Sequence, residues 1–100
     1  LSARALALLE REIPTFDLTG MESYDTQDVL NAVTSETGGL FKSRGEARRA
    51  LEQGGVYLNG ERLGVERVPV PRERLLHGRY LLLRRGARTY VLARVDFPGR

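Results

Sequence analysis

The chain has 100 residues, 41% of them hydrophobic and 29% charged, which is typical of one globular domain with a modest core. It has no cysteine and one histidine, which excludes disulfides, thiolate zinc sites and a histidine-based metal cluster. It has no apolar run of about 18 residues, so no membrane-spanning helix is expected. Residues 1–13 are charged and lack a signal-peptide pattern, and we expect a cytoplasmic protein.

The net charge of +3 is unevenly distributed. Residues 1–40 carry two arginines against seven acidic residues, a net charge of −5, and residues 41–100 carry fourteen cations against six acidic residues, a net charge of +8. A basic C-terminal part indicates a polyanionic partner. Thirteen of these cations are arginine, which makes bidentate contacts with phosphate and stacks on bases. A genome that prefers arginine to lysine would leave the same composition.

The first 40 residues predict two helices. Residues 1–13 have apolar residues at helical spacing, and Pro14 ends this helix because it disfavours helical geometry at Ile13. Residues 14–24 are interpreted as a linker. A second helix is expected over about 27–37, capped by Asp25 or Thr26 and ended by two glycines. Its inward side chains are expected to be Val29, Leu30 and Val33.

A basic helix and a tight hairpin follow. Residues 43–46 (Ser-Arg-Gly-Glu) have the form of a capping box, in which the Ser43 hydroxyl and the Glu46 carboxylate bind opposing backbone amides. The helix is expected to reach about residue 53, with two glycines after it. Asn59 and the glycine after it lie between residues 56–58 (Val-Tyr-Leu) and 61–63 (Glu-Arg-Leu), which is a strong hairpin signal.

The remaining residues predict a second hairpin. Residues 64–71 are irregular, residues 72–76 form a short turn or helix, and residues 79–85 and 88–95 are two strands. The tail, 96–100, is expected to be frayed. The fold class is therefore α+β, with N-terminal helices packed on a small, mostly antiparallel sheet.

Three stretches carry a resemblance to a known family. They are residues 42–61, beginning Lys-Ser-Arg-Gly-Glu-Ala-Arg-Arg and ending Gly-Gly-Val-Tyr-Leu-Asn-Gly-Glu, residues 76–86 (Leu-His-Gly-Arg-Tyr-Leu-Leu-Leu-Arg-Arg-Gly), and residues 12–16 (Glu-Ile-Pro-Thr-Phe). The first resembles the S-four-like RNA-binding fold. The other two favour the C-terminal domain of bacterial-type tyrosyl-tRNA synthetases. The resemblance implies a lead-in helix and linker from an upstream body at 1–24, the RNA-binding domain at 25–95, and a tail at 96–100.

In that family, this domain binds tyrosine tRNA near the anticodon stem and the long variable arm. A separate N-terminal domain carries out aminoacylation with ATP and Mg²⁺. The resemblance implies that this fragment is not an enzyme and has no catalytic, metal or cofactor site of its own. It further implies that the fragment is a monomer, that the parent chain is a homodimer, and that the partners are tyrosine tRNA and the upstream catalytic domain.

The candidate RNA-binding residues are mostly cations of the basic helix and of the two hairpins. They are Lys42, Ser43, Arg44, Arg48, Arg49, Asn59, Arg62, Arg84, Arg85 and Arg88. Solvated surface would explain the cations equally, and the turn alone would explain Asn59. The tyrosines at 57, 80 and 90 are interpreted as half-buried strand residues, with base stacking as the alternative. His77 is assigned a structural or solvent-exposed role.

Two other interpretations stay open. The fold also occurs as an RNA-binding module of pseudouridine synthases, RNA methyltransferases and ribosome-associated proteins. Alternatively, the chain is a protein-docking module whose arginines are only surface, which predicts RNA binding with little dependence on salt.

Overall fold

The computed structural model describes residues 2–97. Most helices precede most strands in the chain, and the sheet includes one strand, at residues 15–18, from the N-terminal part. The helices are α1 (Ala3–Glu12), α2 (Thr26–Ala32), α3 (Arg44–Glu52) and the short 3-10 helix η1 (Arg72–Arg74). The strands are β1 (Thr15–Leu18), β2 (Val56–Leu58), β3 (Glu61–Arg62), β4 (Tyr80–Arg85) and β5 (Thr89–Val95). Within the described residues, no helix is long and apolar enough to cross a membrane.

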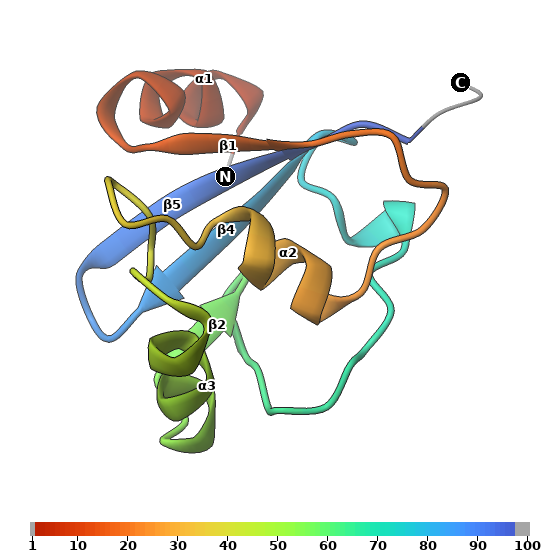
Figure 1. Ribbon diagram of the computed structural model, residues 1–100. Coiled ribbons are helices and arrows are strands. Elements are labelled where there is room, and N and C mark those ends of the chain that lie inside the picture. Colours follow the sequence, from red (N-terminus) through yellow and green to blue (C-terminus); the bar gives the residue numbers. More distant parts are fainter. Residues whose placement is uncertain (1, 98–100) are drawn as a thin grey trace.

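The five strands form one mixed sheet in the order β1-β5-β4-β2-β3 (Figure 1). Strand β1 runs parallel to β5, with Thr15 opposite Leu92, and the other neighbouring strands are antiparallel. The predicted α+β class with a mostly antiparallel sheet is confirmed.

The two faces of the sheet are covered by different helices. One face carries Leu81 and Leu83, which join the main core with residues of α2 and α3. Because side chains alternate along a strand, Leu92 of β5 points to the other face, where Leu6 of α1 is also fully buried. Figure 1 shows α1 beside β1 and β5, apart from α2 and α3.

Several elements agree with the sequence. Ile13 leaves helical geometry ahead of Pro14, with φ −124° and ψ 156°, so α1 ends where predicted. Asp25 caps α2 in a complete capping box with Asp28, and each side chain accepts the other residue's N–H at 2.8 Å. The three side chains predicted to point inward from this helix and its C-cap, Val29, Leu30 and Val33, are buried.

The segment predicted as a linker contains strand β1, so that prediction is wrong for residues 15–18. Its backbone pairs with β5, and the Asp96 N–H donates to the Leu18 carbonyl at 2.9 Å just beyond the pair. A four-residue strand of this kind has no local signal, because the partner that makes it a strand lies at the other end of the chain.

Helix α2 ends at Ala32, five residues before the predicted end. The chain folds back instead, as the N–H of Leu40 donates to the Val33 carbonyl at 2.8 Å and the N–H of Ser35 donates to the Phe41 carbonyl at 2.9 Å. This return brings Gly39 so close that an added Cβ would lie 2.4 Å from the Ser35 nitrogen. The glycine therefore permits a close backbone approach and does not stop the helix.

The predicted fraying of the tail is wrong for its first residues. Phe97 is buried, and its ring meets the Tyr24 ring edge-on with the centroids 5.3 Å apart. The guanidinium carbon of Arg72 lies 4.5 Å from the Phe97 centroid on the outside. The rest of the predicted tail, 98–100, lies outside the described residues.

Candidate nucleic-acid interface

The start of α3 is held by Ser43 and Glu46. The Ser43 hydroxyl accepts the Glu46 N–H at 3.2 Å, which confirms the first half of the predicted capping box. The Glu46 carboxylate instead accepts the N–H of Lys42 at 3.4 Å and the Arg85 guanidinium at 2.9 Å. The same carboxylate therefore ties the start of the helix to the end of strand β4.

The outer side of α3 is cationic. Ala47 and Leu51 are buried against the core, and Arg44, Arg48 and Arg49 are exposed on the other side. Arg48 forms an ion pair with Glu52 one turn later at 3.6 Å, with both side chains more than half exposed. Such exposed pairs contribute only about 0.3–0.5 kcal/mol, so Arg48 can exchange this partner for a phosphate.

The turn between β4 and β5 lies directly beside this helix. The N–H of Gly86 donates to the carbonyl of Gly55 at 2.9 Å, just after α3 ends. A depression of about 350 Å³ lies between the helix and the turn, and its lining includes Arg49 from the helix and Arg85 from the strand. Arg88 is exposed at the same turn.

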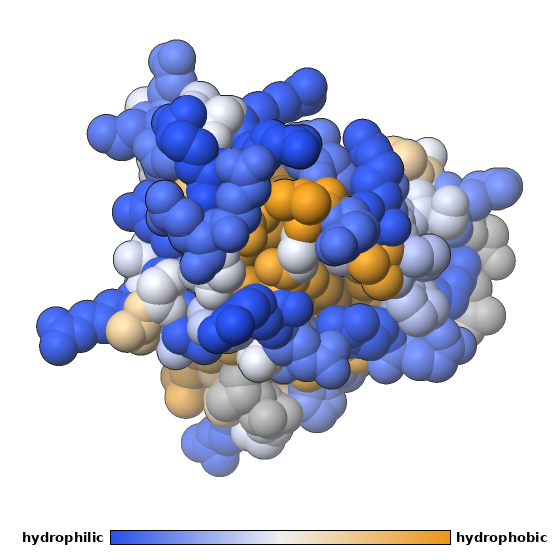
Figure 2. All heavy atoms as spheres, turned by 90° about the horizontal axis from the view of Figure 1, so that it is seen from below, coloured by the Kyte–Doolittle hydropathy of each residue, from blue (hydrophilic) through white to orange (hydrophobic). Residues whose placement is uncertain are grey.

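These contacts define the α3 surface, which consists of Lys42, Ser43, Arg44, Arg48, Arg49 and Arg85. It carries five cations, with Glu46 and Glu52 as the carboxylates that contact them. Figure 2 views the molecule from the end at which α3 lies and shows mostly hydrophilic side chains around an apolar centre.

Arg62 and Arg84 do not belong to the α3 surface. Arg84 precedes Arg85 on β4, so their side chains point to opposite faces of the sheet. The guanidinium carbon of Arg84 lies 3.8 Å from the Tyr57 ring centroid, and Arg62 donates to the Tyr57 hydroxyl at 3.4 Å. That hydrogen bond, and then the charge of Arg62, lower the pKa of the Tyr57 phenol.

The side chain of Asn59 is used inside the protein. Its amide nitrogen donates to the carbonyl of Arg74 at 2.7 Å, and its amide oxygen accepts the N–H of Leu82 at 2.9 Å. The backbone has φ of +49° at Asn59 and +86° at Gly60, as the predicted hairpin turn requires. Asn59 therefore links the β2–β3 turn to β4 and to η1.

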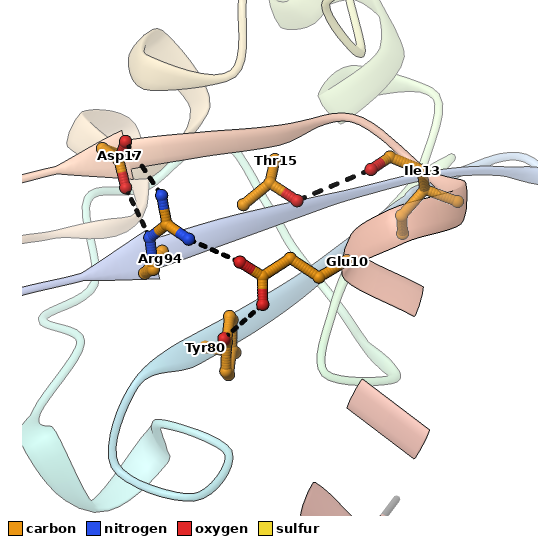
Figure 3. Close-up of polar contacts among 6 residues, drawn as sticks. All are labelled: Glu10, Ile13, Thr15, Asp17, Tyr80 and Arg94. Atoms are coloured by element: carbon orange, nitrogen blue, oxygen red, sulfur yellow. Dashed lines mark hydrogen bonds and ion pairs between the residues drawn. The ribbon is translucent and has the colours of Figure 1, made fainter. Parts of the chain in front are cut away.

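A polar network that the sequence did not reveal fastens α1 to the sheet (Figure 3). Glu10 accepts hydrogen bonds from the Tyr80 hydroxyl and from Arg94, both at 2.5 Å, and Arg94 also donates to Asp17 at 2.7 Å. The hydrogen bond to Glu10, and then burial, raise the pKa of the Tyr80 phenol. Tyr80 thus has a structural role, as the half-buried interpretation predicted.

His77 lies in a turn with φ of +52°, followed by Gly78 with φ of +69°. This geometry agrees with the structural role assigned to it from the sequence. Two residues that were not among the ten candidates, Tyr57 and Tyr90, lie next to candidates on the sheet. The Tyr57–Arg62 pair follows from the predicted turn at Asn59 and Gly60, because a two-residue turn places these residues opposite one another. The pairing of Tyr57 with Arg84 depends on β2 lying beside β4, which the sequence did not predict.

The geometry defines a small α+β domain with a cationic helical surface and no membrane-spanning helix in the described part. The family model described as "Tyrosine--tRNA ligase SYY-like C-terminal domain" matches residues 6–93. The chain therefore belongs to this family of tyrosine-tRNA ligase C-terminal domains.

Individual proteins similar to this chain are also described as tyrosine-tRNA ligases. The chain is 44% identical over 57 residues to a tyrosine-tRNA ligase of Opitutus terrae, which covers 57% of the chain and 13% of that protein. It is 39% identical over 83 residues to that of Corynebacterium efficiens, covering 83% of the chain and 19% of the relative. It is 30% identical over 97 residues to that of Amoebophilus asiaticus, covering 96% and 22%. The chain thus spans less than a quarter of the length of these relatives.

Proposed function

We propose that this chain is the tRNA-binding domain of a tyrosine-tRNA ligase and that it contacts tRNA phosphates through the α3 surface. The observation that carries the proposal is the convergence of cations from two elements. Arg44, Arg48 and Arg49 come from the helix, and Arg85 comes from the sheet and is held beside the helix by Glu46. Family membership supports tyrosine tRNA as the particular RNA.

The chemistry of binding follows from these side chains. Arginine guanidinium groups offer paired donors that match phosphate oxygens, so each contact fixes orientation as well as neutralising charge. Arg88 extends the surface along the β4–β5 turn, and Asn59 acts by supporting the neighbouring hairpin. Selection among RNAs comes from the shape of the stem and the long variable arm, because an RNA stem hides its base edges from side chains. The S-four-like fold is part of this proposal.

The activity of the whole protein is a further part of the proposal. A catalytic domain upstream in the same polypeptide would aminoacylate tyrosine tRNA with ATP and Mg²⁺, in a homodimeric, cytoplasmic enzyme. The present domain would raise the effective concentration of tRNA at that catalytic domain through the covalent linkage. As an isolated fragment it would be a monomer without catalytic activity.

The test is binding of the 100-residue chain to tyrosine tRNA transcripts with and without the long variable arm, across a series of salt concentrations. The double variant Arg48→Glu/Arg49→Glu reverses two charges of the α3 surface. The double variant Arg4→Glu/Arg11→Glu reverses two exposed charges of α1 and is the matched control. Log affinity falls with log salt concentration, and each lost phosphate contact makes this slope less steep by roughly 0.9. The α3 variant should therefore make the slope less steep by roughly 2.

The proposal expects a preference for the transcript with the long arm and loss of that preference in the α3 variant alone. Equal weakening by both double variants would mean that net charge, and not this surface, determines binding. Binding that neither variant changes would refute the α3 surface as the reader and revive the protein-docking interpretation.

A further inference from the structure

Cations and aromatic rings alternate in one row across four neighbouring strands. The register pairs Arg62 of β3 with Tyr57 of β2, Tyr57 with Arg84 of β4, and Arg84 with Tyr90 of β5. Directly paired residues point to the same face of a sheet, and neighbouring strands lie about 4.8 Å apart. We call these four residues the tyrosine–arginine row.

The row lies on the sheet face opposite the α3 surface. Arg84 and Arg85 are consecutive on β4, and Arg85 is bound to Glu46 of α3, so Arg84 points away from that helix. Arg84 therefore lies on the same face of the sheet as Tyr80 and Arg94, and this is the face on which α1 packs. Figure 3 shows how α1 closes its part of that face, with Glu10 reaching over the sheet to Tyr80 and Arg94.

The part of the face that holds the row stays accessible. Tyr90 is 39% exposed, so the half-buried interpretation is wrong for this residue. The exposure is unusual for a large side chain in a strand that is otherwise mostly buried. Arg62 is exposed, and Tyr57 and Arg84 are half-buried. A solvent-accessible aromatic ring on a sheet is the structural requirement for stacking by an unpaired base.

Three side chains of the row, those of Arg62, Tyr57 and Arg84, are also held in place. The guanidinium carbon of Arg84 lies 3.8 Å from the Tyr57 ring centroid, a stacking distance, and its Nη1 donates to the Gly86 carbonyl at 2.5 Å. Arg62 donates from Nη2 to the Tyr57 hydroxyl at 3.4 Å, a contact at the tip of the side chain. Flat groups fixed in this way lose little conformational entropy when a flat ligand stacks on them.

We propose that the tyrosine–arginine row is a second RNA-binding site, which binds unpaired nucleotides of single-stranded RNA by stacking their bases on Tyr57, Arg84 and Tyr90. This inference rests on the proposed RNA-binding function and adds a second surface to it. The two arginines of the row supply charge that complements the backbone phosphates between stacked bases. A paired stem would bind the α3 surface, and unpaired nucleotides would bind the opposite face.

The two surfaces should respond differently to substitution. Tyr90→Val keeps a residue that favours strands but removes the ring, and Tyr90→Phe keeps the ring. Tyr57→Val removes the central ring of the row. Arg48→Gln/Arg49→Gln weakens only the α3 surface. The probes are a short single-stranded oligoadenylate and an RNA duplex of the same length, with binding measured by fluorescence anisotropy of the labelled RNA.

A second readout comes from the protein itself. The chain has no tryptophan and four tyrosines, so its emission reports tyrosine alone. A base stacked on Tyr90 or Tyr57 should quench that emission on addition of oligoadenylate, and the duplex should not.

We expect Tyr90→Val and Tyr57→Val each to weaken oligoadenylate binding about tenfold with a nearly unchanged salt slope, because a stacking contact releases no counterions. Tyr90→Phe should bind normally, and duplex binding should depend only on the α3 variant. Unchanged oligoadenylate binding in both valine variants would overturn the second site and leave the α3 proposal intact. Failure of the unmodified chain to bind any RNA, transcripts included, would refute both.

Discussion

Replacing Asn59 tests whether the hairpin between β2 and β3 depends on side-chain bonds to distant backbone. Asn59→Ala removes two hydrogen bonds, to the Arg74 carbonyl at 2.7 Å and from the Leu82 N–H at 2.9 Å. Both are partly buried, and each contributes about 1 kcal/mol net. Alanine at φ of +49° adds about 1 kcal/mol of backbone strain, so the total loss is about 3 kcal/mol.

Asn59→Gly separates the two contributions. Glycine accepts a positive φ without strain, so this variant should lose only the side-chain bonds, about 2 kcal/mol. Urea denaturation followed by circular dichroism measures both values, and Asn59→Ala should also lower the melting temperature by about 15 °C for a domain of this size.

The result that would refute this reasoning is a free energy of unfolding in Asn59→Ala within about 0.5 kcal/mol of the unmodified chain, the range of surface substitutions. Equal losses in the two variants would refute the strain contribution alone. The folded Asn59→Gly variant should bind the tRNA transcript with unchanged affinity, since the side chain bonds inside the protein. A large loss of affinity would instead restore Asn59 to the RNA contacts that the sequence suggested.

Three further perturbations address the sheet and its connections. Glu10→Ala should lower the free energy of unfolding by about 2 kcal/mol, because Glu10 accepts two hydrogen bonds. The control is Glu12→Ala, which removes the same charge from an exposed position of the same helix. In the same urea titration it should lower the free energy of unfolding by less than about 0.5 kcal/mol. The hydrogen bond from Arg94 lowers the pKa of Asp17 below 3.8 in the folded state, so the unfolded chain takes up the proton first as pH falls. The stabilisation is therefore present above about pH 4 and lost as pH falls through the folded pKa, and Asp17→Asn should show a shallower loss of stability there. Gly39→Ala should destabilise the fold severely in thermal melts, because its Cβ would lie 2.4 Å from backbone nitrogen, and a normal melting temperature would show that the turn can open.

Elements with local chemistry were predictable from the sequence. The Asn59 turn, the end of α1 before Pro14 and the capped start of α3 each depend on residues within one turn of the feature. The end of α2 was not predictable in this way, because it is determined by Leu40 returning to Val33. Strand β1 was missed for the same reason, since its partner is far away in sequence.

The candidate site was predictable by composition but not by arrangement. The cations of α3 follow from helical spacing, and their exposure agrees with it. The list of ten residues treated Arg84 and Arg85 alike, although consecutive strand residues face opposite ways. Glu46, which holds Arg85 to the helix, was assigned only to the cap, because its second contact depends on the position of β4 beside α3.

The position of β5 has a consequence for how the domain is made. This last strand of the described residues lies between β1 and β4, inside the sheet. The Asp17–Arg94 bond joins residues 77 apart, and such distant pairings form slowly because a long loop must close first. During synthesis on a ribosome, β1 and β4 would stay unpaired with β5 until residues 89–95 had emerged. A product truncated before residue 89 would leave both strands with open edges, the feature by which unfinished chains aggregate or are bound by chaperones.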